Sequence, residues 1–182
     1  MRRIGIMGAA FNPPTLGHKD LIEQALVAVD EVWLVPSYMH AFSKRMLSYD
    51  YRCSLLVDFA RDLAEEPGIG DRVKAMPLEH LIYRGGPVYT WDLLCYAQGK
   101  YGSEAELVFL MGPDNLANWQ NFHRSEEISE QWEIFVAQET KHIRSTLVRD
   151  AIEKGLPFGD MVTQRVGERI ENLGYYRVSG ND

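Results

Sequence analysis

The chain has 182 residues, of which 46% are hydrophobic and 25% are charged, and it carries a formal net charge of −7 at neutral pH. These values are typical of a globular protein and exclude a disordered or collagen-like chain. The acidic balance disfavours a partner bound through a nucleic-acid backbone, because proteins of that kind carry a basic face. The length favours one compact domain over residues 1–182.

Apolar segments of strand length alternate with segments of helical periodicity. This alternation predicts βαβ units, and therefore a Rossmann-like α/β fold with an open parallel sheet and helices on both faces. Helical periodicity at the end of the chain predicts a small helical tail over about 145–182 that packs on the sheet. The expected strands are 4–7, 32–35, 73–76, 107–111 and 133–136, and the expected helices are 18–29, 50–65, one starting near Thr90, 145–154 and 160–173.

The two cysteines, Cys53 and Cys95, stand in apolar company without the spacing of a disulfide framework or a zinc site. We expect them to be buried small hydrophobic residues. The apolar run at the start of the chain is too short for a membrane span, so we expect a cytoplasmic protein without a membrane partner. Aromatic residues expected at the surface, such as Tyr101 and Trp132, are compatible with a homo-oligomer.

Residues 8–18 read Gly-Ala-Ala-Phe-Asn-Pro-Pro-Thr-Leu-Gly-His and connect an expected strand to an expected helix. Small residues at the start of this loop let backbone N–H groups approach a phosphate, and the helix N-terminus adds a favourable dipole. His18 can donate hydrogen bonds to charge that accumulates on a phosphoryl group. An ordinary turn is the alternative, but five residues at fixed spacing favour the phosphate site. These are Gly8, Phe11, Pro13, Gly17 and His18.

A second segment, residues 143–149, reads Ile-Arg-Ser-Thr-Leu-Val-Arg at another expected helix start. Ser145 and Thr146 offer donors at the positive end of the helix dipole, and Arg149 follows one turn later, where it can meet a triphosphate. Taken alone, the Ser-Thr pair predicts only a helix cap. Together with residues 8–18 it indicates a second part of the same phosphate site.

Both segments resemble signatures of the nucleotidyltransferase superfamily, which includes nicotinate and nicotinamide mononucleotide adenylyltransferases, phosphopantetheine adenylyltransferase and cytidylyltransferases. The first resembles Gly-x-Phe-x-Pro-x-His/Thr-x-Gly-His, with Ala9 and Ala10 where Gly-Thr is usual and Thr15 at the position of the first histidine. The second resembles Ile-Ser-Ser-Thr-x-Ile-Arg, with Arg144 in place of the first serine. The resemblance implies that His18 stabilises the transition state at the nucleotide α-phosphate.

Further segments resemble the pyridine mononucleotide enzymes of this superfamily. Residues 35–37, followed by His40, Lys44, Leu47 and Arg52, resemble a loop after the second strand that places a His and a Lys or Arg near phosphates. Lys44 is therefore the expected phosphate contact. Residues 87–94 resemble the segment that holds the pyridine ring. Residues 111–124 resemble a Gly-x-Asp-x-Leu motif that follows a buried strand, together with the aromatic-rich stretch after it. An electron-poor pyridine can stack on Trp91, Trp119 or Phe122, although each of these aromatics can instead belong to the core.

The resemblance implies in-line attack of a mononucleotide phosphate on ATP, which yields a dinucleotide and pyrophosphate. Mg²⁺ is expected to arrive with ATP, without a metal site on the protein. A phosphopantetheine adenylyltransferase-like enzyme and a non-catalytic nucleotide sensor remain alternatives, and the choice between nicotinate and nicotinamide stays open because backbone donors leave no residue signature.

The residues implied by the resemblance fall into three groups. The catalytic residues are His18, Thr15 and Lys44. The ATP-binding residues are Gly8, Ala9, Ala10, Phe11, Gly17, His18, Gly112, Asp114, Ile143, Ser145, Thr146 and Arg149. The mononucleotide-binding residues are Asn12, Lys44, Tyr89, Thr90, Trp91, Trp119, Phe122 and Arg124.

Overall fold

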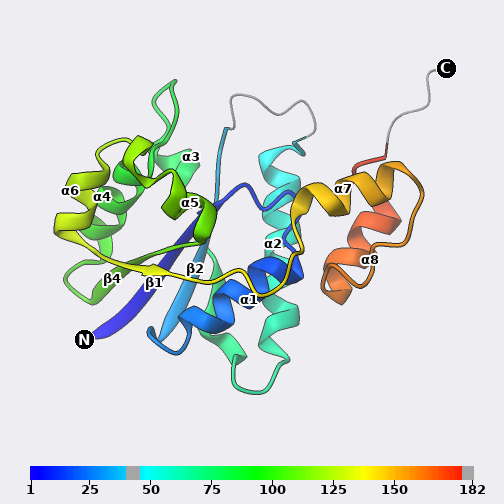
Figure 1. Ribbon diagram of the computed structural model, residues 1–182, viewed down its shortest axis with the longest axis horizontal. Helices are drawn as coiled ribbons and strands as arrows, with labels where there is room; N and C mark the ends of the chain where they lie inside the picture. The colour runs from blue at the N-terminus through cyan, green and yellow to red at the C-terminus, as the bar shows by residue number, and fades with distance from the viewer. Residues whose placement is uncertain (40–45, 178–182) are drawn as a thin grey trace.

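The computed structural model describes residues 1–39 and 46–177, and these form one five-stranded sheet in the order β3-β2-β1-β4-β5 (Figure 1). Each neighbouring pair of strands is parallel. The predicted Rossmann-like α/β fold is therefore confirmed. The strands are β1 (Arg2–Ala9), β2 (Glu31–Pro36), β3 (Val73–Ala75), β4 (Ala105–Met111) and β5 (Glu133–Val136).

Helices cover both faces of this sheet. In Figure 1, α4 and α6 lie to one side of the strands, and α1, α2, α7 and α8 lie to the other. The longer helices are α1 (Leu16–Ala25), α2 (Tyr49–Ala64), α4 (Thr90–Tyr101), α6 (Ser125–Gln131), α7 (Ser145–Glu153) and α8 (Gln164–Leu173). The short helical turns are η1 (Gly70–Arg72), α3 (Glu79–Ile82), α5 (Pro113–Ala117) and η2 (Trp119–Asn121).

The strands divide their side chains between two apolar cores, as the period of two along a strand requires. In β2, for example, Val32 and Leu34 belong to the core under α1 and α2, whereas Trp33 and Val35 belong to the core under α4 and α6. Both faces of the central strands are therefore buried. This explains why the sequence shows them as uninterrupted apolar runs.

Helix α8 lies against α2. Val166 and Ile170 join the larger core, and two arginines of α8 reach carboxylates of α2. Arg165 pairs with Asp62, and Arg169 pairs with Asp58, whose side chain is buried. The described part of the helical tail is thus attached to the sheet through α2.

The burial expected for both cysteines and the exposure expected for Trp132 are wrong. Cys95 is exposed and Cys53 only partly buried, because both lie off the apolar face of their helices. Trp132 is buried instead of exposed, and its indole N–H donates to Gln98. Within residues 1–39 and 46–177, none of the helices combines the length and the apolar character needed to cross a membrane.

The contact between α2 and α8 generates the first prediction. Arg169→Met leaves the buried Asp58 carboxylate without its cation, and we expect the free energy of unfolding to fall by about 1–3 kcal/mol. Arg177→Met is the matched control, since Arg177 pairs with Glu171 and both side chains are mostly exposed. Urea unfolding of both variants at neutral pH measures the difference. Equal losses in the two variants would contradict this account of how α8 is held.

Candidate active site at the carboxyl ends of β1 and β4

A pocket of about 360 Å³ lies where β1 and β4 end side by side. From the central strand β1 the chain adds β2 and β3 on one side, and it then returns to add β4 and β5 on the other side. The carboxyl ends of β1 and β4 are therefore the topological switch point, where ligands bind in open parallel sheets. Four stretches of chain line it: the end of β1, the start of α1, the end of β4, and residues 139–146. The lining residues that were expected at the site are Gly8, Ala9, Thr15, Gly17, His18, Gly112, Asp114, Ile143, Ser145 and Thr146.

Thr15 and His18 form the start of α1. The Thr15 hydroxyl accepts from the backbone N–H groups of Gly17 (3.1 Å) and His18 (3.4 Å), and the Thr15 N–H donates to His18 Nδ1 (2.9 Å). This reciprocal arrangement is a capping box in which an imidazole takes the place usually held by a Glu or Gln. The role of Thr15 visible in the structure is therefore to orient the His18 ring.

This geometry defines the protonation of His18. Nδ1 accepts from a backbone N–H, so the proton of the neutral ring resides on Nε2, which is left as a hydrogen-bond donor. Burial lowers the pKa of His18 to about 4. At neutral pH the site thus presents an uncharged imidazole with a fixed tautomer.

Gly17 brings the two signature segments together. A Cβ atom at this position would lie 2.1 Å from the carbonyl oxygen of Ile143, far inside any allowed contact. The second segment is also tied to the first loop, because Ser145 Oγ donates to the Pro13 carbonyl (2.7 Å) and Arg149 Nη1 to the Asn12 carbonyl (2.8 Å). The N-terminus of α7 therefore lies beside that of α1, with the pocket along both.

The charged groups around the pocket are mostly paired. Arg144 bridges Asp114 (2.6 Å) and Glu139 (3.0 Å), which connects the β4–α5 turn with residues 139–144. Asp20 accepts from the hydroxyl of Thr140 (2.5 Å). Lys141 also lines the pocket, and nothing in the sequence distinguished it from other surface lysines.

The other expected residues lie outside the lining of this pocket. Ala10 and Phe11 follow the lining residue Ala9 in the first loop, and Arg149 donates to the backbone of that loop. The Asn12 amide oxygen is taken by the chain itself, since it accepts from Tyr176 Oη (2.7 Å) and the Leu47 N–H (3.2 Å). Lys44 falls outside the described residues.

The aromatic residues expected at the pyridine ring gather at the start of α4 and in residues 119–124. The Tyr89 and His123 rings contact each other in a tilted arrangement with centroids 4.4 Å apart, and the Arg124 guanidinium covers the Trp91 ring at 4.3 Å. Trp119 packs between Phe109 and Phe122 and donates its indole N–H to Ser129. Thr90 is the first residue of α4. The structure brings this group together, with the faces of Trp91 and Trp119 already in contact with protein.

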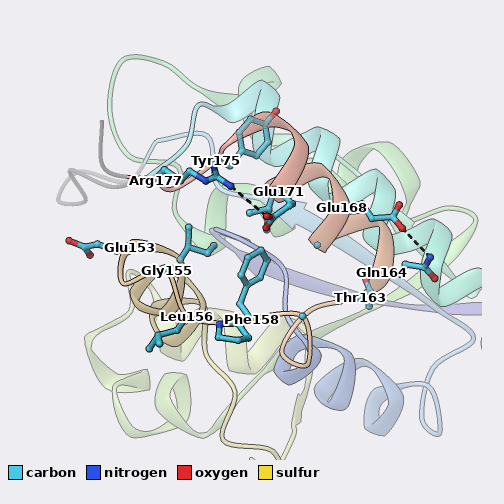
Figure 2. A pocket seen from close by; sticks show the side chains of 15 residues that line it. Glu153, Gly155, Leu156, Phe158, Thr163, Gln164, Glu168, Glu171, Tyr175 and Arg177 are labelled. Atoms are coloured by element: carbon cyan, nitrogen blue, oxygen red, sulfur yellow. Dashed lines mark hydrogen bonds and ion pairs between the residues drawn. The ribbon is translucent and has the colours of Figure 1, made fainter. Parts of the chain in front are cut away.

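A larger groove of about 1020 Å³ lies between α7 and α8 (Figure 2). Its floor includes Ile152 and Ile170, and Glu153, Glu168 and Glu171 lie around it. It contains none of the expected site residues, and its one lining arginine, Arg177, already pairs with Glu171, which leaves the lining net negative and unfavourable for a phosphate. We therefore place the chemistry at the smaller pocket. Among the described residues there is also no cluster of three His, Cys, Asp or Glu side chains able to hold a metal ion.

The fold and this pocket define an α/β protein that offers two helix N-termini and a neutral histidine to an anionic ligand. Residues 6–151 match the family model described as cytidylyltransferase-like, and the chain belongs to this family.

Similar proteins narrow the comparison. The "Probable nicotinate-nucleotide adenylyltransferase" of Myxococcus xanthus is 26% identical, with 96% of this chain and 94% of that protein covered. The nicotinate-nucleotide adenylyltransferase of Bacillus subtilis is 21% identical, with 97% and 99% covered. A solved structure from Vibrio parahaemolyticus, provisionally assigned as a nicotinate-nucleotide adenylyltransferase, is 36% identical over 98% of both chains with a TM-score of 0.83. The nicotinic acid mononucleotide adenylyltransferase of Plasmodium falciparum shares the fold, with a TM-score of 0.73 at 15% identity over 97% of this chain and 98% of that chain.

The capped and half-buried state of His18 can be tested by NMR. We expect the ring to titrate near pH 4 and to show the Nε2-protonated tautomer at pH 7, because burial opposes the charge and Nδ1 is occupied. Since an unfolded histidine titrates near about 6.5, protonation favours the unfolded chain, and His18 should lower stability as the pH falls from about 6.5 to 4. His18→Gln assigns the resonance. A midpoint above about 6 would contradict the geometry described here.

Proposed function

We propose that the protein joins ATP and a pyridine mononucleotide, with nicotinate mononucleotide as the preferred acceptor, to give the dinucleotide and pyrophosphate. The observation that carries this proposal is the His18 imidazole, fixed through Nδ1 beside the adjoining N-termini of α1 and α7, with Nε2 as its donor and no bond from Nε2 to any residue that the structure describes. The family membership of the chain supports it, as do the names of its relatives. NAD biosynthesis is the process such a product serves.

The chemistry asks little of the protein beyond position and charge. A mononucleotide phosphate is already an anionic nucleophile, so no strong base and no covalent intermediate are required. Negative charge builds on the α-phosphate oxygens in the transition state. We propose that His18 donates to these oxygens through Nε2, and that Thr15 acts by orienting the ring.

The triphosphate would lie along the start of α7. Ser145 and Thr146 begin that helix, where unpaired N–H groups and the helix dipole favour anions. Lys141 lies at the same rim and adds charge. The carboxylates that line the pocket are engaged by Arg144 and Thr140, so we propose that Mg²⁺ enters bound to ATP.

The mononucleotide side rests on fewer observations. We retain Lys44 as the proposed phosphate contact and the aromatic group around Trp91, Trp119 and Phe122 as the proposed pyridine site. For either indole to stack on a ligand, the Arg124 or Phe122 side chain now against it has to move. A cytoplasmic location and a homo-oligomer also stay predictions.

An acceptor panel tests the proposed reaction. The purified protein is incubated with Mg·ATP and, separately, nicotinate mononucleotide, nicotinamide mononucleotide or phosphopantetheine, and pyrophosphate release and the adenylylated product are quantified. We expect the highest kcat/KM with nicotinate mononucleotide. Product with phosphopantetheine alone supports a phosphopantetheine adenylyltransferase-like enzyme. Tight ATP binding without pyrophosphate release for any acceptor supports a non-catalytic nucleotide sensor. Either result overturns the proposal.

His18→Ala tests the proposed role of the imidazole. We expect kcat to fall by about 100- to 1,000-fold, because a fixed transition-state donor is lost. The melting temperature should fall only slightly, because the variant loses one hydrogen bond of the α1 capping box. His80→Ala is the matched control, since His80 lies on α3 and contacts Tyr49 away from the pocket. Near-normal turnover in the His18 variant would rule out this role.

A further inference from the structure

Phe11 links the first loop to His18. Its backbone adopts φ = 50°, in the left-handed region that a bulky residue seldom occupies. Its side chain is fully buried, with the ring centroid 4.9 Å from that of His18. A strained conformation of this kind persists only where the surroundings impose it. The residues before and after Phe11 show what imposes it.

Arg52 holds the residue before Phe11. Its side chain is completely buried, and Nη1 donates to the carbonyl oxygens of Ala10 (2.9 Å) and Ser37 (2.7 Å). Its Nε donates to the Leu47 carbonyl (2.9 Å). A buried cation that ends on backbone carbonyls fixes the direction of those peptide groups.

Tyr176 holds the residue after Phe11. Its hydroxyl donates to Asn12 Oδ1 (2.7 Å), which also accepts from the Leu47 N–H. Tyr176 comes from the segment after α8, more than 160 positions away along the chain. Neither Arg52 nor Tyr176 lines the pocket at β1 and β4.

We propose that Arg52 and Tyr176 are positioning residues that hold Phe11 in its left-handed conformation against the His18 ring. They act through the loop and touch no substrate. This inference rests on the proposed role of His18 for its kinetic consequence, but the placement of the ring itself is measurable without any reaction.

Arg52→Lys is the first test, because lysine keeps the charge and loses the planar fork. We expect kcat to fall roughly 10- to 100-fold, with the KM for each substrate changed less than about twofold, since the pocket lining is untouched. The NMR resonances of the His18 ring should also shift. Arg72→Lys is the matched control: Arg72 likewise donates to backbone carbonyls, those of Leu26, Val29, Asp30 and Gly68, at the opposite end of the strands.

Tyr176→Phe is the milder second test and removes one hydroxyl. We expect kcat to fall about 3- to 10-fold, as for one lost hydrogen bond, with a smaller shift of the same His18 resonances. Tyr175→Phe is its control, because Tyr175 is the adjacent buried tyrosine and its ring stacks on Tyr51. If Arg52→Lys does not fold, the pair Tyr176→Phe and Tyr175→Phe decides.

The outcomes separate this inference from the proposed function. His18 resonances that move in the Arg52 and Tyr176 variants, but not in the controls, support the positioning role even if the wild-type protein forms no dinucleotide. Unmoved His18 resonances in folded Tyr176→Phe overturn it. So does a loss of kcat that follows only the folded fraction measured by thermal unfolding, because a structural role alone would produce that.

Discussion

The approach of Gly17 to the Ile143 carbonyl is the constraint on which the site depends. Only a residue without a side chain allows the start of α1 to lie this close to the chain that enters α7. Ser145 and Arg149 then bond to the carbonyl groups of the first loop. Two segments separated by more than 120 positions thereby become one binding surface with two helix N-termini.

The distribution of charge shows why the net negative charge of the chain does not exclude a phosphate ligand. The net charge of −7 belongs to the whole chain, whereas the pocket presents N–H groups, hydroxyls and the neutral His18. Arg144, which stands in place of a motif serine, adds no free positive charge, because Asp114 and Glu139 bond to it. Lys141 is one cation of the lining, and the helix N-termini add backbone dipoles, which act over short range and suit a small ligand rather than a polyanion.

Much of the fold could be predicted from the sequence because the strands are buried on both faces and stand out as continuous apolar runs. The helix bounds were less exact. The helix expected over 18–29 ends at Ala25, and the one expected over 160–173 begins at Gln164, since turns follow or precede them and local patterns define ends poorly. Cys95 was misplaced because its apolar sequence neighbours occupy other faces of α4.

The lining of the pocket could be predicted where a motif gives the spacing of its residues, but not where tertiary contacts decide. The spacing of residues 8–18 indicated His18 and Gly17, but not that Thr15 would orient the imidazole. Neither the inward turn of Asn12 nor the pairing of Arg144 has a local signal, since their partners lie far away in the chain. The contacts of Arg52 and Tyr176 with the first loop likewise become visible only when α2 and the segment after α8 are placed in the fold.

The capping box at α1 also limits the reactions that this site can host. The Nδ1 atom of His18 is committed to its own helix, so the ring cannot take up a proton without giving up the N–H of Thr15. A group in that state can donate a hydrogen bond but is poorly suited to shuttle protons. Acceptors that arrive already ionised need no such shuttle. Substrates with a neutral hydroxyl or amine as the attacking group would need a base supplied by another residue.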